Sequence, residues 1–290
     1  MEQKATFRFS AFADEITPEF DGQIEALQTL GIPLLELRGV DGKSFTLLTD
    51  EEAETVRKKL SNAHIGLSAL GSPIGKIDAD GDWETHRKLF LRVLELGERL
   101  ECKWIRMFSF YPGSLSPEAF EQRVFALTEE LLELSEKRGF VLCHENEKDI
   151  YGASPESEAK LMKHFGGRLQ AVLDPGNFAF CGLDPKPAYP LLKDYIRYFH
   201  IKDADEDGTI VPPGKGVALL EETLAAVAND RAGEEVILTM EPHLMMFTGL
   251  SSLSKLDDIR HKYAFSSPFE AFQTAYEATR EMVRRVCALA

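Results

Sequence analysis

The sequence predicts an α/β fold, a (β/α)8 TIM barrel in which residues 1–290 form one domain. Three observations support this fold. Short runs of β-branched and aromatic residues alternate with long amphipathic segments from one end of the chain to the other. Several short runs are apolar throughout, as strands covered on both faces must be. Neither a break in composition nor a GxGxxG motif after a strand interrupts the pattern, which favours a closed barrel over an open, doubly wound sheet.

The strands are expected at eight short apolar runs, spaced along the whole chain. They begin near Phe7 (FRFSAF), Leu34 (LLELR), Ile65 (IGLSAL), Trp104 (WIRMFSF), Phe140 (FVLCHE), Leu169 (LQAVLD), Arg197 (RYFHIKD) and Val236 (VILTME). Eight such runs separated by helical patterns are the number that a closed (β/α)8 barrel requires.

Helices are expected between the strands, where apolar residues recur with helical spacing. The expected ranges are Phe20 to Leu30, Glu51 to Leu60, Trp83 to Leu100, Pro117 to Arg138, Glu156 to Phe165, Gly216 to Ala228 and, after the eighth strand, Phe269 to Ala288. Glycine follows three of these helices, at Gly31, Gly139 and Gly166, where it ends a helix readily. A long insertion between Met245 and Ser267 precedes the last helix, and a loop of that length is usually disordered or part of a site.

Composition excludes several classes of protein. The net charge of −15 and the lack of a basic run argue against a nucleic-acid partner. No apolar stretch approaches the roughly 18 residues of a membrane span, and the first residues are not those of a signal peptide, so we expect a cytoplasmic protein with no membrane partner. The four cysteines form no CxxC pair, which argues against a disulfide framework or a thiolate zinc site.

Polar residues end the last four predicted strands, and catalytic groups of a barrel gather at the carboxyl ends of its strands. The fifth strand ends at HENE, the sixth at DPGN, the seventh at HIKD and the eighth at EPH. Neighbouring strands would aim Glu145, Asp174, His200 and Glu241 at one point. Three carboxylates and one imidazole suit a single divalent metal ion, namely Mn²⁺, Mg²⁺, Co²⁺ or Zn²⁺.

Cationic residues near the strand ends are candidates for substrate binding. Arg38, Lys76, Arg106 and Lys202 could neutralise a phosphate or carboxylate, arginine through a bidentate fork and lysine as a point charge. The alternative is that these cations form structural ion pairs, for example between Glu36 and the neighbours of Arg38.

At these positions the sequence resembles the sugar phosphate isomerase/epimerase superfamily, the xylose-isomerase-like metal-dependent TIM barrels. The resemblance is carried, in order, by FADEI, IPLLELR, GSPIGKI, HENE, LDPGN, FHIKD and MEPH. It implies that Glu145, Asp174, His200 and Glu241 bind one divalent metal. Many epimerases of the superfamily have a histidine three residues after the sixth-strand aspartate, where this chain has Asn177, so the substrate-binding role of that position is open. Endonuclease relatives use a three-metal cluster richer in histidine than this chain, which has seven histidines.

The resemblance implies an isomerase or epimerase of a small carbohydrate, phosphorylated or not. Glu145 and Glu241 would act as acid and base on the two faces of an enediolate whose charge the metal stabilises. Lys202 and His243 would stabilise the oxyanion or move protons. A dehydratase that eliminates a β-hydroxyl from the same intermediate is the main alternative, and a non-catalytic sugar-binding barrel is a further one. A homo-oligomer is compatible with the sequence, which leaves the oligomeric state open.

Overall fold

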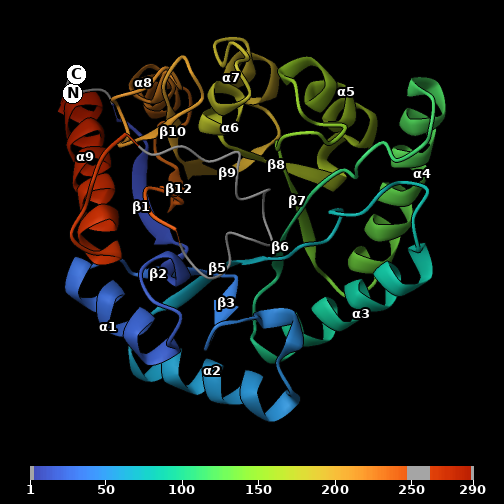
Figure 1. Cartoon of the computed structure of the whole chain (residues 1–290), viewed down its shortest axis with the longest axis horizontal. Helices are drawn as coiled ribbons and strands as arrows, with labels where there is room; N and C mark the ends of the chain where they lie inside the picture. Colours follow the sequence, from blue (N-terminus) through green and yellow to red (C-terminus); the bar gives the residue numbers. More distant parts are fainter. Residues whose placement is uncertain (1–2, 247–261, 289–290) are drawn as a thin grey trace.

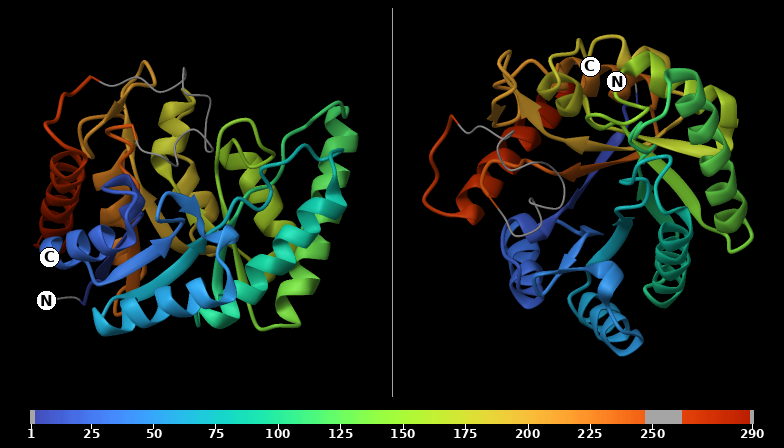
Figure 2. Two further views of the ribbon diagram at one scale, coloured as in Figure 1. Left: turned by 60° about the horizontal axis from the view of Figure 1, so that its bottom comes forward. Right: turned by 45° about the vertical axis from the view of Figure 1, so that its right-hand side comes forward.

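A computed structural model describes residues 3–246 and 262–288, and in it eight parallel strands close into a barrel (Figures 1 and 2). The barrel strands are β1 (Thr6–Ala11), β2 (Leu34–Leu37), β5 (Gly66–Gly71), β6 (Trp104–Met107), β7 (Val141–Glu145), β8 (Leu169–Leu173), β9 (Ile196–Ile201) and β12 (Glu235–Met240). The first and last of them, β1 and β12, pair in parallel from Thr6 with Glu235 to Ala11 with Met240. All eight predicted strands are therefore confirmed, and so is the predicted fold class.

Helices surround the barrel, as Figure 1 shows from one end. They are α1 (Phe20–Leu30), α2 (Asp50–Asn62), α3 (Trp83–Arg99), α4 (Pro117–Glu136), α5 (Pro155–Phe165), α6 (Pro175–Phe180), α7 (Ala188–Leu192), α8 (Leu220–Asp230) and α9 (Pro268–Ala288). Local chemistry sets several of their ends: Thr49 caps α2 in a capping box with Glu52, and Gly31 ends α1 in the left-handed conformation at φ 70°. Within the described residues, no helix combines the length and the apolar character needed to cross a bilayer.

Short elements that the sequence did not predict follow several barrel strands at their carboxyl ends. They are two hairpins, β3 (Gly39–Val40) with β4 (Lys43–Ser44) and β10 (Asp203–Ala204) with β11 (Ile210–Val211), and the 3-10 helices η1 (Ala13–Glu15) and η2 (Phe45–Leu47). A third 3-10 helix, η3 (Gly166–Arg168), leads into β8 at the amino end. Most of the insertion predicted after the eighth strand, residues 247–261, lies outside the described residues.

One predicted helix start is wrong. The helix expected from Gly216 begins at Leu220, because the residues before it are held in a loop by the buried carboxylate of Asp203. That carboxylate accepts backbone N–H bonds from Gly214, Gly216 and Ala218 at 2.8 to 3.1 Å. A side chain that bonds backbone N–H groups competes directly with helix formation.

The floor of the site is an apolar layer inside the barrel. Ala69, Cys143, Val172 and Tyr198 form a separate buried cluster contributed by four strands. Cys143 lies two residues before Glu145 and Tyr198 two residues before His200, so these pairs share a face of their strands. The polar residues at the strand ends therefore lie above a buried, mainly apolar layer of the core.

Candidate metal centre

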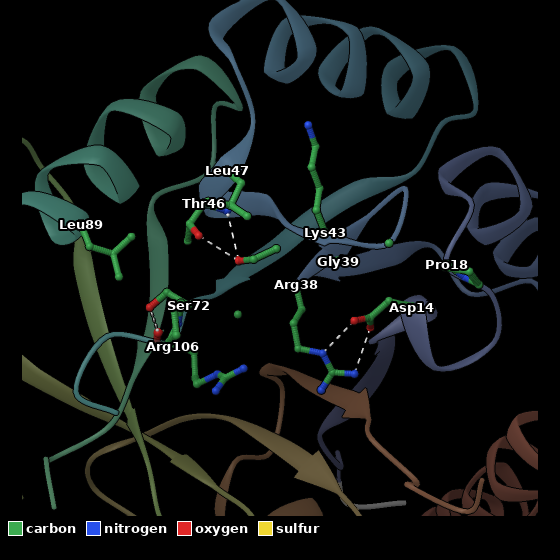
Figure 3. A pocket seen from close by; sticks show the side chains of 14 residues that line it. Asp14, Pro18, Arg38, Gly39, Lys43, Thr46, Leu47, Ser72, Leu89 and Arg106 are labelled. Carbon is green, nitrogen blue, oxygen red and sulfur yellow. Dashed lines mark hydrogen bonds and ion pairs between the residues drawn. The ribbon is translucent and has the colours of Figure 1, made fainter. Parts of the chain in front are cut away.

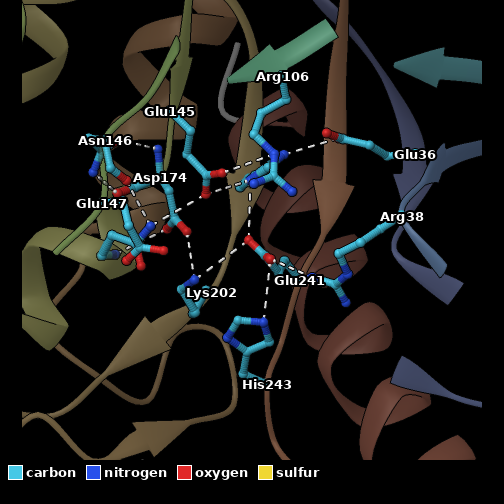
Figure 4. A network of polar contacts seen from close by, with 12 residues as sticks. Glu36, Arg38, Arg106, Glu145, Asn146, Glu147, Asp174, Lys202, Glu241 and His243 are labelled. Carbon is cyan, nitrogen blue, oxygen red and sulfur yellow. Dashed lines mark hydrogen bonds and ion pairs between the residues drawn. The ribbon is translucent and has the colours of Figure 1, made fainter. Parts of the chain in front are cut away.

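Four side chains predicted as metal ligands converge at the carboxyl end of the barrel, and Figure 4 labels Glu145, Asp174 and Glu241 among them. Glu145 is the last residue of β7, Asp174 follows β8 and caps α6, His200 lies in β9, and Glu241 follows β12. One ligand atom from each lies within 4.8 Å of all the others. All four residues are buried, with at most 4% of their surface exposed. The structure thus brings together the complete predicted set, which could hold a metal ion.

The donor atoms of this cluster point at one another and at a cation. Nδ1 of His200 lies 2.9 Å from Oε1 of Glu145 and 3.2 Å from Oε2 of Glu241. The Lys202 ammonium lies 3.0 Å from Oδ2 of Asp174 and 3.5 Å from Oε2 of Glu241. Within the described residues, those two carboxylate oxygens accept no hydrogen bond of good geometry although they are buried. Buried oxygens left in this way, together with one imidazole nitrogen, fit a divalent cation.

Glu36 holds the imidazole of His200 from the opposite side. Its Oε2 lies 3.0 Å from Nε2 of His200, and its Oε1 accepts a 2.8 Å hydrogen bond from the hydroxyl of Tyr198. A carboxylate at Nε2 fixes the proton there and leaves Nδ1 to face the cluster. The sequence marks Glu36 as a charged residue inside an apolar strand, but it does not identify this partner.

Two asparagines complete the support of the carboxylates. The side chain of Asn146 donates to the carbonyl of Asp174 at 2.8 Å and accepts from its backbone N–H at 2.9 Å, which ties the ends of β7 and β8 together. The Asn177 side chain donates to the carbonyl of Asn146 at 2.8 Å and approaches Oε1 of Glu145 at 3.4 Å. Asn177, predicted to bind substrate, thus also positions its neighbours.

The predicted substrate-binding cations surround the cluster, and most are already paired. Arg38 lies 2.9 Å from Asp14 through Nε, 2.9 Å from Glu241 through Nη1 and 3.3 Å from Glu15 through Nη2. The ammonium of Lys76 lies 3.1 Å from Oε2 of Glu147. Arg38 and Lys76 therefore form ion pairs in this structure, as the alternative to substrate binding predicted.

The ion-pair partners of Arg38 differ from the example that the sequence suggested, which involved Glu36. Its described partners are Asp14, Glu15 and Glu241, whereas Glu36 contacts His200 instead. His243 lies beside the same group, with Nε2 at 3.3 Å from Glu241 and 3.4 Å from Glu15. Glu15, Glu241 and His243 form a second set of three groups close enough to share a cation.

Burial and neighbouring charges shift the pKa of several ionisable groups in this site in opposite directions. Burial raises the pKa of Asp174 to about 7, although the Lys202 ammonium opposes the shift. Burial likewise raises the pKa of Glu15 to about 8, against the effect of Arg38. Burial alone would lower the pKa of Lys202, but Asp174 and the other carboxylates outweigh it and raise the pKa. The raised pKa of Lys202 shows that the negative charge of the carboxylates around it favours a cation at this place.

His144 precedes Glu145 in the strand but points away from the cluster, because successive strand residues face opposite sides. Its Nε2 lies 2.8 Å from the hydroxyl of Ser109, and its Nδ1 lies 3.4 Å from Oε1 of Glu158. Burial lowers the pKa of His144 to about 3, so its imidazole is neutral at pH 7, and burial raises the pKa of Glu158 well above its ordinary value. They form a packed polar contact behind the site.

An eight-stranded parallel barrel with an acidic, histidine-containing cluster at its strand ends defines the general class of this protein. Residues 24–256 match the family described as xylose isomerase-like TIM barrel, and the chain belongs to that family. No curated protein sequence matches the chain at a significant level.

Solved structures share the fold at low sequence identity. A D-tagatose 3-epimerase-like protein has a TM-score of 0.73 and 14% identity, covering 97% of this chain and 98% of its own. L-ribulose 3-epimerase has a TM-score of 0.74 and 11% identity, with coverage of 98% and 96%. A probable 3-DHS dehydratase from Bacillus anthracis has a TM-score of 0.71 and 13% identity, with coverage of 94% and 98%. The structural neighbours are thus epimerases and related enzymes.

Proposed function

We propose that this chain, acting as one domain, is a divalent-metal-dependent isomerase or epimerase of a small carbohydrate. The observation that supports this most is the approach of two carboxylates to one nitrogen. Glu145 from β7 and Glu241 after β12 lie 2.9 and 3.2 Å from Nδ1 of His200. Two carboxylates that reach one point from different strands are placed to exchange protons with the same substrate.

The residues that would hold the metal are Glu145, Asp174, His200 and Glu241. When bound there, a divalent ion would supply stabilisation of negative charge on substrate oxygens beside the carbon that loses its proton. The known solved relatives at low identity include sugar epimerases, which agrees with carbon-acid chemistry of this kind.

The chain's own groups divide the proton transfers. One of Glu145 and Glu241 takes the proton from the substrate carbon, and the other returns a proton to the opposite face of the planar enediolate, or to the neighbouring carbon in an isomerisation. Arg38 lies 2.9 Å from Oε1 of Glu241 and stabilises its ionised form. Lys202, 3.5 Å from the other oxygen of Glu241, is placed to donate a hydrogen bond to a substrate oxyanion.

Deuterium uptake from D₂O tests this proposal. The full chain loaded with Mn²⁺ is incubated with ketoses, ketose phosphates and inososes, and products are read by mass spectrometry and NMR. We expect uptake of one deuterium at carbon, and Glu145→Gln and Glu241→Gln should each lower the rate at least about a hundredfold. The control is Glu158→Gln, which replaces a fully buried acid, whose pKa is raised by burial, with an amide of the same shape. Unchanged rates in both site variants with metal bound would reject the assignment.

The same experiment separates the second candidate, a dehydratase. Lys202 supports this alternative, because an ammonium beside Glu241 is also placed to protonate a departing hydroxyl. One of the structural neighbours is a probable dehydratase. Loss of one water from the substrate mass would identify elimination, whereas an isomerase or epimerase leaves the mass unchanged apart from deuterium.

A further inference from the structure

A cavity of about 570 Å³ opens beside the candidate metal centre, on the other half of the barrel (Figure 3). It is lined by residues of the segment from Arg38 to Leu47, by the end of β5 and by Arg106 of β6. Its inner end meets the metal centre, because Arg38 and Arg106 line it and contact Glu241 and Glu145 respectively. Its volume is in the range of pockets that hold small ligands, about 300 to 1,000 Å³.

Arg106 is the unusual side chain of this cavity. Its side chain is 2% exposed, yet its closest charged partner is Oε2 of Glu145 at 3.4 Å from Nε, and the geometry there is not that of a hydrogen bond. Across residues 3–246 and 262–288, Glu145 is the only carboxylate paired with Arg106, and its terminal nitrogens Nη1 and Nη2 donate no hydrogen bond. Arg38, Lys76 and Lys202 differ, since each has a carboxylate oxygen within 3.1 Å. The guanidinium of Arg106 thus lines the cavity with unused donors, and an anion bound in the cavity could accept hydrogen bonds from them.

The surroundings of Arg106 hold its guanidinium in a fixed plane. Its Cζ lies 4.5 Å from the ring centroid of Phe108 and 5.5 Å from that of Phe12. Gly71 leaves the space for it, since a Cβ there would lie 3.1 Å from Nη2 and 2.6 Å from the Phe12 ring.

We infer that Arg106 binds a carboxylate of the substrate, and that the substrate is a sugar acid of the 2-oxo acid class. This inference rests on the proposed function. A rigid guanidinium fork matches a planar carboxylate through two parallel hydrogen bonds. The 3.4 Å contact with Glu145 places the carboxylate next to the reacting carbons. A phosphate at the far end of a sugar chain lies several bonds from that position and does not reach the fork while the reacting carbons stay between the two glutamates.

Binding of matched compounds to the Mn²⁺-loaded full chain tests the inference. The panel contains 2-oxo sugar acids of four to six carbons, the ketoses that match them carbon for carbon, and the terminal phosphates of those ketoses. One such set is 2-keto-D-gluconate, D-fructose and D-fructose 6-phosphate. We expect at least one acid to bind at least tenfold more tightly than its ketose and its phosphate. A panel in which no acid is preferred, or in which phosphates are preferred, overturns the inference.

Substitutions distinguish binding of the acid by Arg106 from binding by the metal and from nonspecific attraction to positive charge. Arg106→Gln should remove the preference for the acid, which is a loss of about tenfold to hundredfold in the ratio of acid affinity to ketose affinity. Arg106→Lys keeps the charge without the fork and should restore part of it. The control Lys43→Gln removes a positive charge from the outer wall of the same cavity, where Lys43 pairs with Glu52, and should change binding less than twofold. A preference that survives Arg106→Gln means that the metal alone binds the acid, which refutes the role of Arg106.

Folding and chemistry are read independently. Thermal melting and Mn²⁺ titration show whether each Arg106 variant is folded. If Arg106→Gln does not fold, Arg106→Lys decides the question: a preference for the acid that is reduced relative to the unchanged chain supports the inference, and an undiminished preference refutes it. Failure of the two proposals is distinguishable. Deuterium uptake by ketoses without a preference for acids rejects the carboxylate site and keeps the isomerase. Arg106-dependent binding of acids without deuterium uptake rejects the isomerase and keeps the carboxylate site.

Discussion

Replacing Glu36 by glutamine is expected to weaken metal binding, although Glu36 is not one of the four proposed ligands. Its Oε2 lies 3.0 Å from Nε2 of His200, on the side of the ring away from the cluster. Glu36→Gln keeps the shape of the side chain but removes the negative charge that orients the imidazole and increases the electron density at Nδ1. Loss of such a carboxylate partner lowers metal affinity about 10- to 100-fold, or about 1.4 to 2.7 kcal/mol.

Titration calorimetry of the metal-free full chain with Mn²⁺ measures this change. Tyr198→Phe provides an intermediate case, because it removes the 2.8 Å hydrogen bond to Glu36 but keeps the carboxylate, and we expect a loss of about threefold or less. Glu158→Gln is the control, since this buried acid contacts His144 and not a proposed ligand. An affinity of folded Glu36→Gln that stays within twofold of the unchanged chain would refute the reasoning.

Three further predictions concern the metal, a turn and a histidine. Asp174→Asn should lower Mn²⁺ affinity at least about a hundredfold by calorimetry, and unchanged affinity would remove Asp174 from the ligand set. Gly75→Ala should cost more than about 3 kcal/mol in urea unfolding, since at φ 89° its Cβ would lie 2.0 Å from the carbonyl oxygen of Phe108. Gly31→Ala, at φ 70° with nothing within 4 Å, should cost only about 1 kcal/mol, and equal costs would contradict the packing argument. Burial lowers the pKa of His86 from 6.5 to about 4, so the unfolded chain takes up the proton first as pH falls. The stability that neutral His86 contributes is complete above pH 6.5 and is lost as the pH falls towards 4. The unfolding free energies of the unchanged chain and of His86→Gln should therefore converge by up to about 3 kcal/mol between pH 6.5 and pH 4. Free energies that fall in parallel with pH would argue against a lowered pKa of His86.

The fold was predictable because the barrel depends on a repeated pattern. Each strand is an apolar run buried on both faces, and each helix has an apolar stripe, so local periodicity carries the information. The four proposed ligands were predictable for the same reason, since they end successive strands. The late start of α8 was not predictable, because it depends on Asp203, which bonds backbone groups 11 to 15 residues further along the chain.

The partners of the cations depend on contacts between distant strands and could not be predicted. Arg38 is 203 residues from Glu241 in sequence, and Glu36 is 164 residues from His200. The sequence suggests that Arg38 and Glu36 are either functional residues or members of structural ion pairs. Only the residues that surround them in space distinguish these two roles. Arg106 is distinguished from the other cations by the partners it lacks within the described residues, a property that residue type and spacing do not encode.

The metal centre and the cavity occupy different halves of one barrel. The proposed ligands come from β7, β8, β9 and β12, which are neighbours in the barrel, whereas the cavity is lined from the η1, β2, β5 and β6 side. Substitutions at distant sites usually have additive effects. A library that varies Thr46 and Leu47 can therefore change which molecule is accepted while every member keeps the proposed metal ligands. Such an arrangement lets new specificities arise by single steps without passing through inactive proteins.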